Sequence, residues 1–71
     1  MNITVNGENR DIPKELTVAE LLEECDVKMP DMVSVELNGD ILRRGTYAEQ
    51  TVGEGDKVEF LYFMGGGEQW V

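Results

Sequence analysis

The chain has 71 residues and a formal net charge of −9, with 6 Lys plus Arg against 15 Asp plus Glu. A chain of this length forms one small domain that buries only about 60% of its unfolded surface, which leaves little room for an enclosed active site. Its negative charge disfavours nucleic acid and anionic membranes as partners and favours basic protein surfaces.

Histidine is absent and cysteine occurs once. The commonest general base and metal ligand is therefore missing, and an internal disulfide is excluded. We expect a protein that is not an enzyme and that holds no metal. Because the sequence shows neither a signal segment nor an apolar run of membrane-spanning length, a soluble cytoplasmic protein is predicted.

The first predicted unit is a β-hairpin. Residues 1–5 alternate, with Ile3 and Val5 on one face, and Asn6-Gly7 follows directly. Asn-Gly favours a type I′ turn because both central residues of that turn need positive φ. Residues 8–12 are predicted to return antiparallel, up to a proline that cannot donate a ladder hydrogen bond.

A short helix is predicted next, over residues 18–25. Thr17 suits its N-cap, and Glu20 is placed to complete a capping box. One apolar stripe at helical spacing consists of Val18, Leu21, Leu22 and Cys25. We interpret Cys25 as a small structural hydrophobe with a raised pKa, with a reactive or sulfur-carrying role as the alternative. The opposite, acidic face is interpreted as solvated surface, with docking of a basic partner as the alternative.

A second strand–turn–strand pattern follows a connector at residues 28–31. Residues 32–37 alternate and precede Asn38-Gly39, a second turn signal, after which residues 40–43 form a short strand at most. Arg44, adjacent to another arginine, is interpreted as solubilising or as a contact for an acidic partner or for the chain's own terminal carboxylate. Residues 45–53 have no clear period, although Tyr47 and Val52 are expected to cover an edge of the core.

The last predicted strand, residues 57–64, is apolar on both faces near its end. Its core face is predicted to contain Val58, Phe60 and Tyr62. With this assignment of faces, Leu61 and Phe63 point outward beside Met64. They are expected to be exposed there and to form a protein docking surface, unless a loop covers them.

Three glycines, Gly65, Gly66 and Gly67, then interrupt the strand before residues 68–71. Three consecutive glycines carry a high backbone entropy cost in a ladder, so residues 65–71 are predicted to be a flexible tail of a domain formed by residues 1–64. Such an arm fits a narrow channel in another protein. A frayed terminus without a role is the alternative.

These pieces together resemble the ubiquitin-like β-grasp fold, and more specifically the small sulfur carriers of the ThiS type. The resemblance covers nearly the whole chain up to Gly67. It rests on the order and spacing of short motifs: Val5-Asn6-Gly7, Thr17-Val18 with Leu21-Leu22, Leu37-Asn38-Gly39 with Ile41 and Arg44, Gly55-Asp56, and Phe63-Met64-Gly65-Gly66-Gly67. It implies an α+β fold with a mixed sheet of four or five strands packed on one helix.

The resemblance also implies a function as a protein substrate. In such carriers the diglycine, matched here by Gly66 and Gly67, ends the mature chain. A ThiF-like enzyme adenylates its carboxylate with ATP, a persulfide from a cysteine desulfurase converts it to a thiocarboxylate, and a ThiG-like thiazole synthase accepts the sulfur. Leu61, Phe63, Met64 and Arg44 are the expected docking residues. The carrier binds no cofactor itself and is expected to act as a monomer.

The four residues after Gly67 depart from that pattern, because they lock the carboxylate to be activated in a peptide bond. We expect a peptidase to remove them first. Some similar carriers with such a tail serve cysteine, homocysteine or other sulfur transfer, and the molybdopterin carrier shares the fold, so these pathways are alternatives to thiamine synthesis. A further alternative is a ubiquitin-like interaction module with Trp70 as its anchor.

Overall fold

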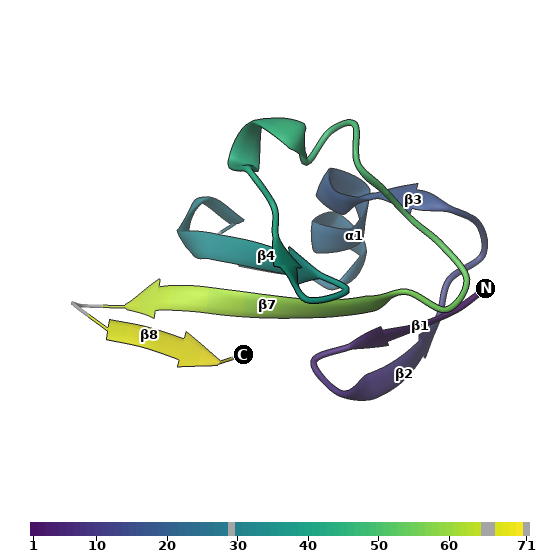
Figure 1. The fold of residues 1–71 in the computed structure, drawn as a ribbon, viewed down its shortest axis with the longest axis horizontal. Coiled ribbons are helices and arrows are strands. Elements are labelled where there is room, and N and C mark those ends of the chain that lie inside the picture. The colour runs from purple at the N-terminus through teal and green to yellow at the C-terminus, as the bar shows by residue number, and fades with distance from the viewer. Residues whose placement is uncertain (29, 65–66, 71) are drawn as a thin grey trace.

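The computed structural model describes residues 1–28, 30–64 and 67–70. A mixed sheet packs its one face against a single short helix (Figure 1). Among the described residues the sheet has six strands: five follow the order β2-β1-β7-β4-β5, and the sixth, β8 (Gly67–Trp70), also pairs with β7. β1 and β7 run parallel, and the other neighbours are antiparallel. The bounds of the first five are β1 Asn2–Val5, β2 Glu8–Asp11, β4 Val33–Leu37, β5 Asp40–Ile41 and β7 Lys57–Met64. The predicted β-grasp architecture is confirmed.

Both Asn-Gly pairs form the predicted hairpin turns. Asn6 and Gly7 have φ of 51° and 83°, and Asn38 and Gly39 have φ of 50° and 90°. Two successive positive φ values are what a type I′ turn requires, and asparagine and glycine are the residues that tolerate them best. These turns fix the registers of β1 with β2 and of β4 with β5.

The helix α1, Val18–Glu24, starts at the predicted capping box. The Glu20 amide donates to Thr17 Oγ1 at 3.1 Å, and the Thr17 amide donates to Glu20 Oε1 at 2.9 Å. Two amides that the first helical turn leaves without partners are thereby satisfied, which places the start of the helix.

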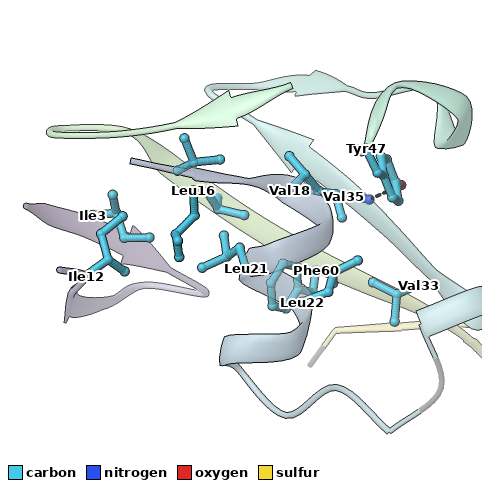
Figure 2. Close-up of a cluster of buried hydrophobic side chains, with 12 residues drawn as sticks. Ile3, Ile12, Leu16, Val18, Leu21, Leu22, Val33, Val35, Tyr47 and Phe60 are labelled. Atoms are coloured by element: carbon cyan, nitrogen blue, oxygen red, sulfur yellow. Dashed lines mark hydrogen bonds between the residues drawn. The ribbon is translucent and has the colours of Figure 1, made fainter. Parts of the chain in front are cut away.

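The core lies between α1 and the sheet, as Figure 2 shows. Its buried members are Ile3, Ile12, Leu16, Val18, Leu21, Leu22, Val33, Val35, Tyr47, Val52, Val58 and Phe60. Tyr47, expected only to cover an edge, is 7% exposed, and its hydroxyl accepts the Val35 amide at 3.0 Å. This bond satisfies a buried backbone donor that no neighbouring strand pairs.

Several elements were not predicted from the sequence. Two short strands, β3 (Leu16–Thr17) and β6 (Thr51–Val52), pair antiparallel in a second small sheet. The described residues also include two 3₁₀ turns, Pro30–Met32 and Arg44–Thr46. Pieces this short carry no readable period, because their positions depend on contacts with distant residues. Within the described ranges, no helix has the length and apolar character needed to cross a membrane.

The face assignment of β7 is confirmed, but the expected exposure of Leu61 is wrong. Val58 and Phe60 are buried in the core and Tyr62 packs partly buried against it. Leu61 is not part of that core cluster, yet it is only 7% exposed. Its backbone is flanked on both sides, by Ser34 of β4 and by Trp70 of a further strand. A residue with paired neighbours on both sides loses accessible surface on both flanks.

Candidate functional site

The candidate site is the C-terminal half of β7 and the segment that follows it. One edge of β7 pairs with β4 along residues 58–62. The other edge is divided between two partners. β1 pairs in parallel with Lys57 and Val58 only, and the C-terminal strand pairs with residues 61–64.

The first part of this divided edge is tightly connected to the fold. The Asn6 amide donates to the Val58 carbonyl at 2.9 Å, and Asn6 Oδ1 accepts the Phe60 amide at 2.8 Å. The side chain of the turn residue Asn6 therefore extends the hydrogen bonding between β1 and β7 as far as Phe60. β1 supplies no backbone partner beyond this point.

The second part of the edge is occupied by β8, Gly67–Trp70, an antiparallel strand that turns back along β7 (Figure 1). No element after the glycines was predicted from the sequence, yet residues 67–70 form this strand. β7 extends past the end of β1 and offers free backbone groups, so even a glycine-led segment finds a ladder there. Gly65, Gly66 and the side chains of Phe63 and Met64 lie outside what the structure describes.

Arg44 holds the connector after α1 in place. Its guanidinium donates to the carbonyls of Pro30 at 2.9 Å and Val33 at 2.8 Å, and it lies 5.7 Å from the centroid of the Tyr47 ring. Planar, multiply donating geometry of this kind is specific to arginine. The residue is exposed overall, and its predicted docking role stays a prediction.

Cys25 lies apart from the tail, at the C-terminal end of α1. It is half-buried beside a groove of about 490 Å³ between the β1–β2 hairpin and the helix end. Burial raises the pKa of the Cys25 thiol, against an opposing effect of Arg10 and with a smaller contribution from Glu24. A raised pKa lowers the thiolate fraction at neutral pH, and the thiolate is the nucleophile. This environment favours the structural interpretation of Cys25.

Comparison with known families covers the fold up to the first residue of β8. The sequence profile described as "ThiS family" matches residues 3–67. The chain belongs to the ThiS family of small sulfur carriers. The family match ends at Gly67, so residues 68–71 lie beyond it.

Solved ThiS structures agree with this membership. A crystal structure of the thiamine biosynthesis protein ThiS from Geobacter metallireducens is 49% identical, with a TM-score of 0.86, over 94% of this chain and 100% of that one. A solution structure of a thiamine biosynthesis protein from the same organism is 51% identical, with a TM-score of 0.77, over 94% and 88% of the two chains.

Two curated relatives are larger proteins. A thiazole synthase of Paramagnetospirillum magneticum is 40% identical over 67 residues, which are 94% of this chain and 20% of that protein. A thiazole synthase of Magnetococcus marinus is 35% identical over 68 residues, 96% of this chain and 21% of that protein. The chain therefore spans about a fifth of the length of the curated relatives that it matches.

Proposed function

We propose that this ThiS-family chain carries sulfur as a thiocarboxylate on Gly67 after residues 68–71 have been removed. The observation that carries the proposal is the end of the family match at Gly67, directly after the glycines that follow β7. Glycine at a terminus offers a carbonyl without a side chain, which another protein's narrow active site can admit. The half-buried Cys25, with its raised pKa, is the weaker candidate for carrying sulfur.

The proposed chemistry begins with hydrolysis of the Gly67–Glu68 peptide bond, which gives a free carboxylate on Gly67. That carboxylate attacks the α-phosphorus of ATP on a ThiF-like enzyme, and pyrophosphate leaves. The acyl adenylate is electrophilic, so the terminal sulfur of a persulfide supplied by a cysteine desulfurase displaces AMP. A thiol then cleaves the sulfur–sulfur bond and leaves a thiocarboxylate. Every catalytic group and the nucleotide site belong to the partners.

The proposed acceptor is a thiazole-forming enzyme. Two proteins named thiazole synthase contain a segment similar to this chain within their own length. Fusion of a carrier to its acceptor raises the effective concentration of one for the other, so the association supports the assignment. Transfer toward cysteine, homocysteine or molybdopterin is the alternative that a test of acceptors distinguishes.

The testing measurement is the intact mass of the protein recovered from its host, with and without an alkylating agent that traps thiocarboxylates. We expect a species that ends at Gly67 and is heavier by the replacement of one oxygen with sulfur. A matched assay compares chains ending at Gly67 and at Val71 for ATP–pyrophosphate exchange with the adenylating enzyme. Only the shorter chain should support exchange. A full-length species alone, under both sulfur and thiamine limitation, would contradict the proposal.

A further inference from the structure

The strand β8 covers a stretch of sheet edge that the rest of the fold leaves open. β1 stops pairing with β7 at Val58. The next amide on this edge, that of Phe60, donates its hydrogen bond to the Asn6 side chain. Beyond Phe60, β8 is the partner of β7 on this edge, through residues 61–64. The last four residues of β7 therefore depend on the chain's own C-terminal segment for pairing on that side.

The direction of each backbone group follows from alternation along β7. The Val58 carbonyl and the Phe60 amide face the β1 edge, whereas the Lys57 amide and carbonyl face Asn38 at the end of β4. Successive residues of a strand direct their backbone groups to opposite edges. The backbone amides and carbonyls of Tyr62 and Met64 therefore face β8, and those of Leu61 face β4.

The register carries this direction into β8. Tyr62 lies opposite Gln69, and Met64 lies opposite Gly67. Because both groups of a hydrogen-bonded antiparallel pair face each other, the carbonyl of Gly67 is directed at β7. This is the carbonyl of the Gly67–Glu68 bond. Neighbouring strands are about 4.8 Å apart, so β7 leaves no space for a catalytic group on that side.

From this geometry we infer that β8 is a strap that keeps the Gly67–Glu68 bond closed to a peptidase until the strand unpairs from β7. The inference rests on the proposed function, because it concerns the tail that must be removed. A peptidase has to polarise the scissile carbonyl and surround it, and neither is possible while that carbonyl faces Met64. Cleavage then proceeds through local opening, at a rate proportional to the open fraction when opening and closing are fast.

The strap also has a consequence after cleavage. Hydrolysis removes three of the four residues of β8 and leaves Gly67 as the new terminus. One remaining residue cannot form a strand pair with β7. The backbone groups of Tyr62 and Met64 therefore lose their partners in the same step that creates the carboxylate. Processing thereby releases both the reactive terminus and the end of β7.

Amide hydrogen exchange by NMR tests the pairing itself, in the full chain and in a chain ending at Gly67. We expect the Tyr62 amide to exchange at least tenfold faster in the shorter chain. The Leu61 amide, which faces β4, and the Phe60 amide, which donates to Asn6, should exchange at unchanged rates. A Tyr62 amide that exchanges equally fast in both chains would overturn the strap. Neither result depends on any sulfur chemistry.

A reversible lock tests the protection of the scissile region. Leu61 and Trp70 lie opposite each other, and their backbone groups face away from the shared edge. They therefore form a non-hydrogen-bonded antiparallel pair, the type with the shorter Cα–Cα distance. Leu61→Cys with Trp70→Cys should therefore form a disulfide. The probe is a glutamate-specific endopeptidase, which cleaves the adjacent bond after Glu68. To bind that bond, the enzyme must also take Gly67 and Gln69, which face β7, out of the ladder, and product masses are read over time.

The oxidised double variant should resist cleavage after Glu68, and reduction of the same sample should restore it by at least tenfold. The Leu61→Cys single variant, under both redox conditions, controls for the loss of the leucine. Equal cleavage of locked and reduced forms would overturn the strap. If the locked form is protected while the host protein is never found shortened, the strap stands and the proposed carrier function fails.

Discussion

The two halves of β7 differ in what holds them. Residues 57–60 are held by β1 and the Asn6 side chain on one edge and by β4 and Asn38 on the other, and the side chains of Val58 and Phe60 are buried in the core under α1. Residues 61–64 pair with β8 on one edge, and only Leu61 and Tyr62 also pair with β4 on the other, so this half depends on the segment that we propose is removed. The first half is therefore held by strands that stay in place, whereas the second half would change its neighbours if residues 68–71 are removed as we propose.

The largest effect expected from this contrast is at Phe60. Its ring is 2% exposed and lies in the core between β7 and α1 (Figure 2). Phe60→Ala should lower the free energy of unfolding by about 3–5 kcal/mol, because it deletes buried surface and leaves a cavity. Urea denaturation measures this. The loss should be the same in chains ending at Gly67 and at Val71. A difference between them would show that the first half of β7 is not independent of the tail.

Leu61 tests the second half. Leu61→Ala should cost about 2–3 kcal/mol in the full chain, since the side chain is 7% exposed. The cost should be smaller in the chain ending at Gly67, where the residue opposite Leu61 on β8 has been removed. Urea denaturation of the four proteins gives the coupling between Leu61 and the tail as a double-mutant cycle. Equal costs at both chain lengths would show that β8 does not contribute to the burial of Leu61.

Asn6 marks the border between the halves. Asn6→Gly keeps the positive φ of the turn but removes the acceptor of the Phe60 amide, and it should cost about 1–3 kcal/mol. Asn6→Asp is the matched control, because a carboxylate oxygen can accept the same bond and aspartate also tolerates this φ. The glycine variant should also speed exchange of the Phe60 amide. If both variants are equally destabilised, the side-chain bond is not what extends β1.

The smallest effect lies at Glu20, remote from β7. The hydrogen bond from the Thr17 backbone amide lowers the pKa of the Glu20 carboxyl in the folded protein. Because the unfolded chain then binds the proton more tightly, this stabilisation is present above the unfolded-state pKa and is lost as pH falls through the folded-state pKa. Urea midpoints measured from neutral pH to about pH 3 should fall less for Glu20→Gln than for the parent. The difference should be identical at both chain lengths, and a dependence on the tail would contradict the remoteness of α1.

The fold was largely predictable because its signals are local. Asn6-Gly7 and Asn38-Gly39 specify turns through their φ preferences, and Thr17 with Glu20 specifies the helix start. The faces of β7 followed from two-residue alternation, and they were assigned correctly at Val58 and Phe60. The position of the diglycine after β7 was also readable, because glycine punctuates a strand.

What could not be predicted depends on groups that meet from distant parts of the chain. The hydroxyl of Tyr47 reaches the Val35 amide, and the guanidinium of Arg44 reaches carbonyls 11 and 14 residues away. A sequence pattern records the type of each side chain and its period, but not which orphaned backbone group it will satisfy. For the same reason Leu61 was expected to be exposed, since its burial follows from its neighbours on two other strands.

The sequence by itself therefore determined the β-grasp order of elements, their turns, the helix cap and the glycine terminus as the candidate site. Each of these depends on backbone preferences or hydrophobic periods that act within a few residues. Only the tertiary structure decided that β1 ends early along β7, that Asn6 bridges to Phe60, and that β8 takes up the remaining edge. The physical reason is that unpaired backbone groups of a strand are satisfied by whatever segment the completed sheet brings beside them.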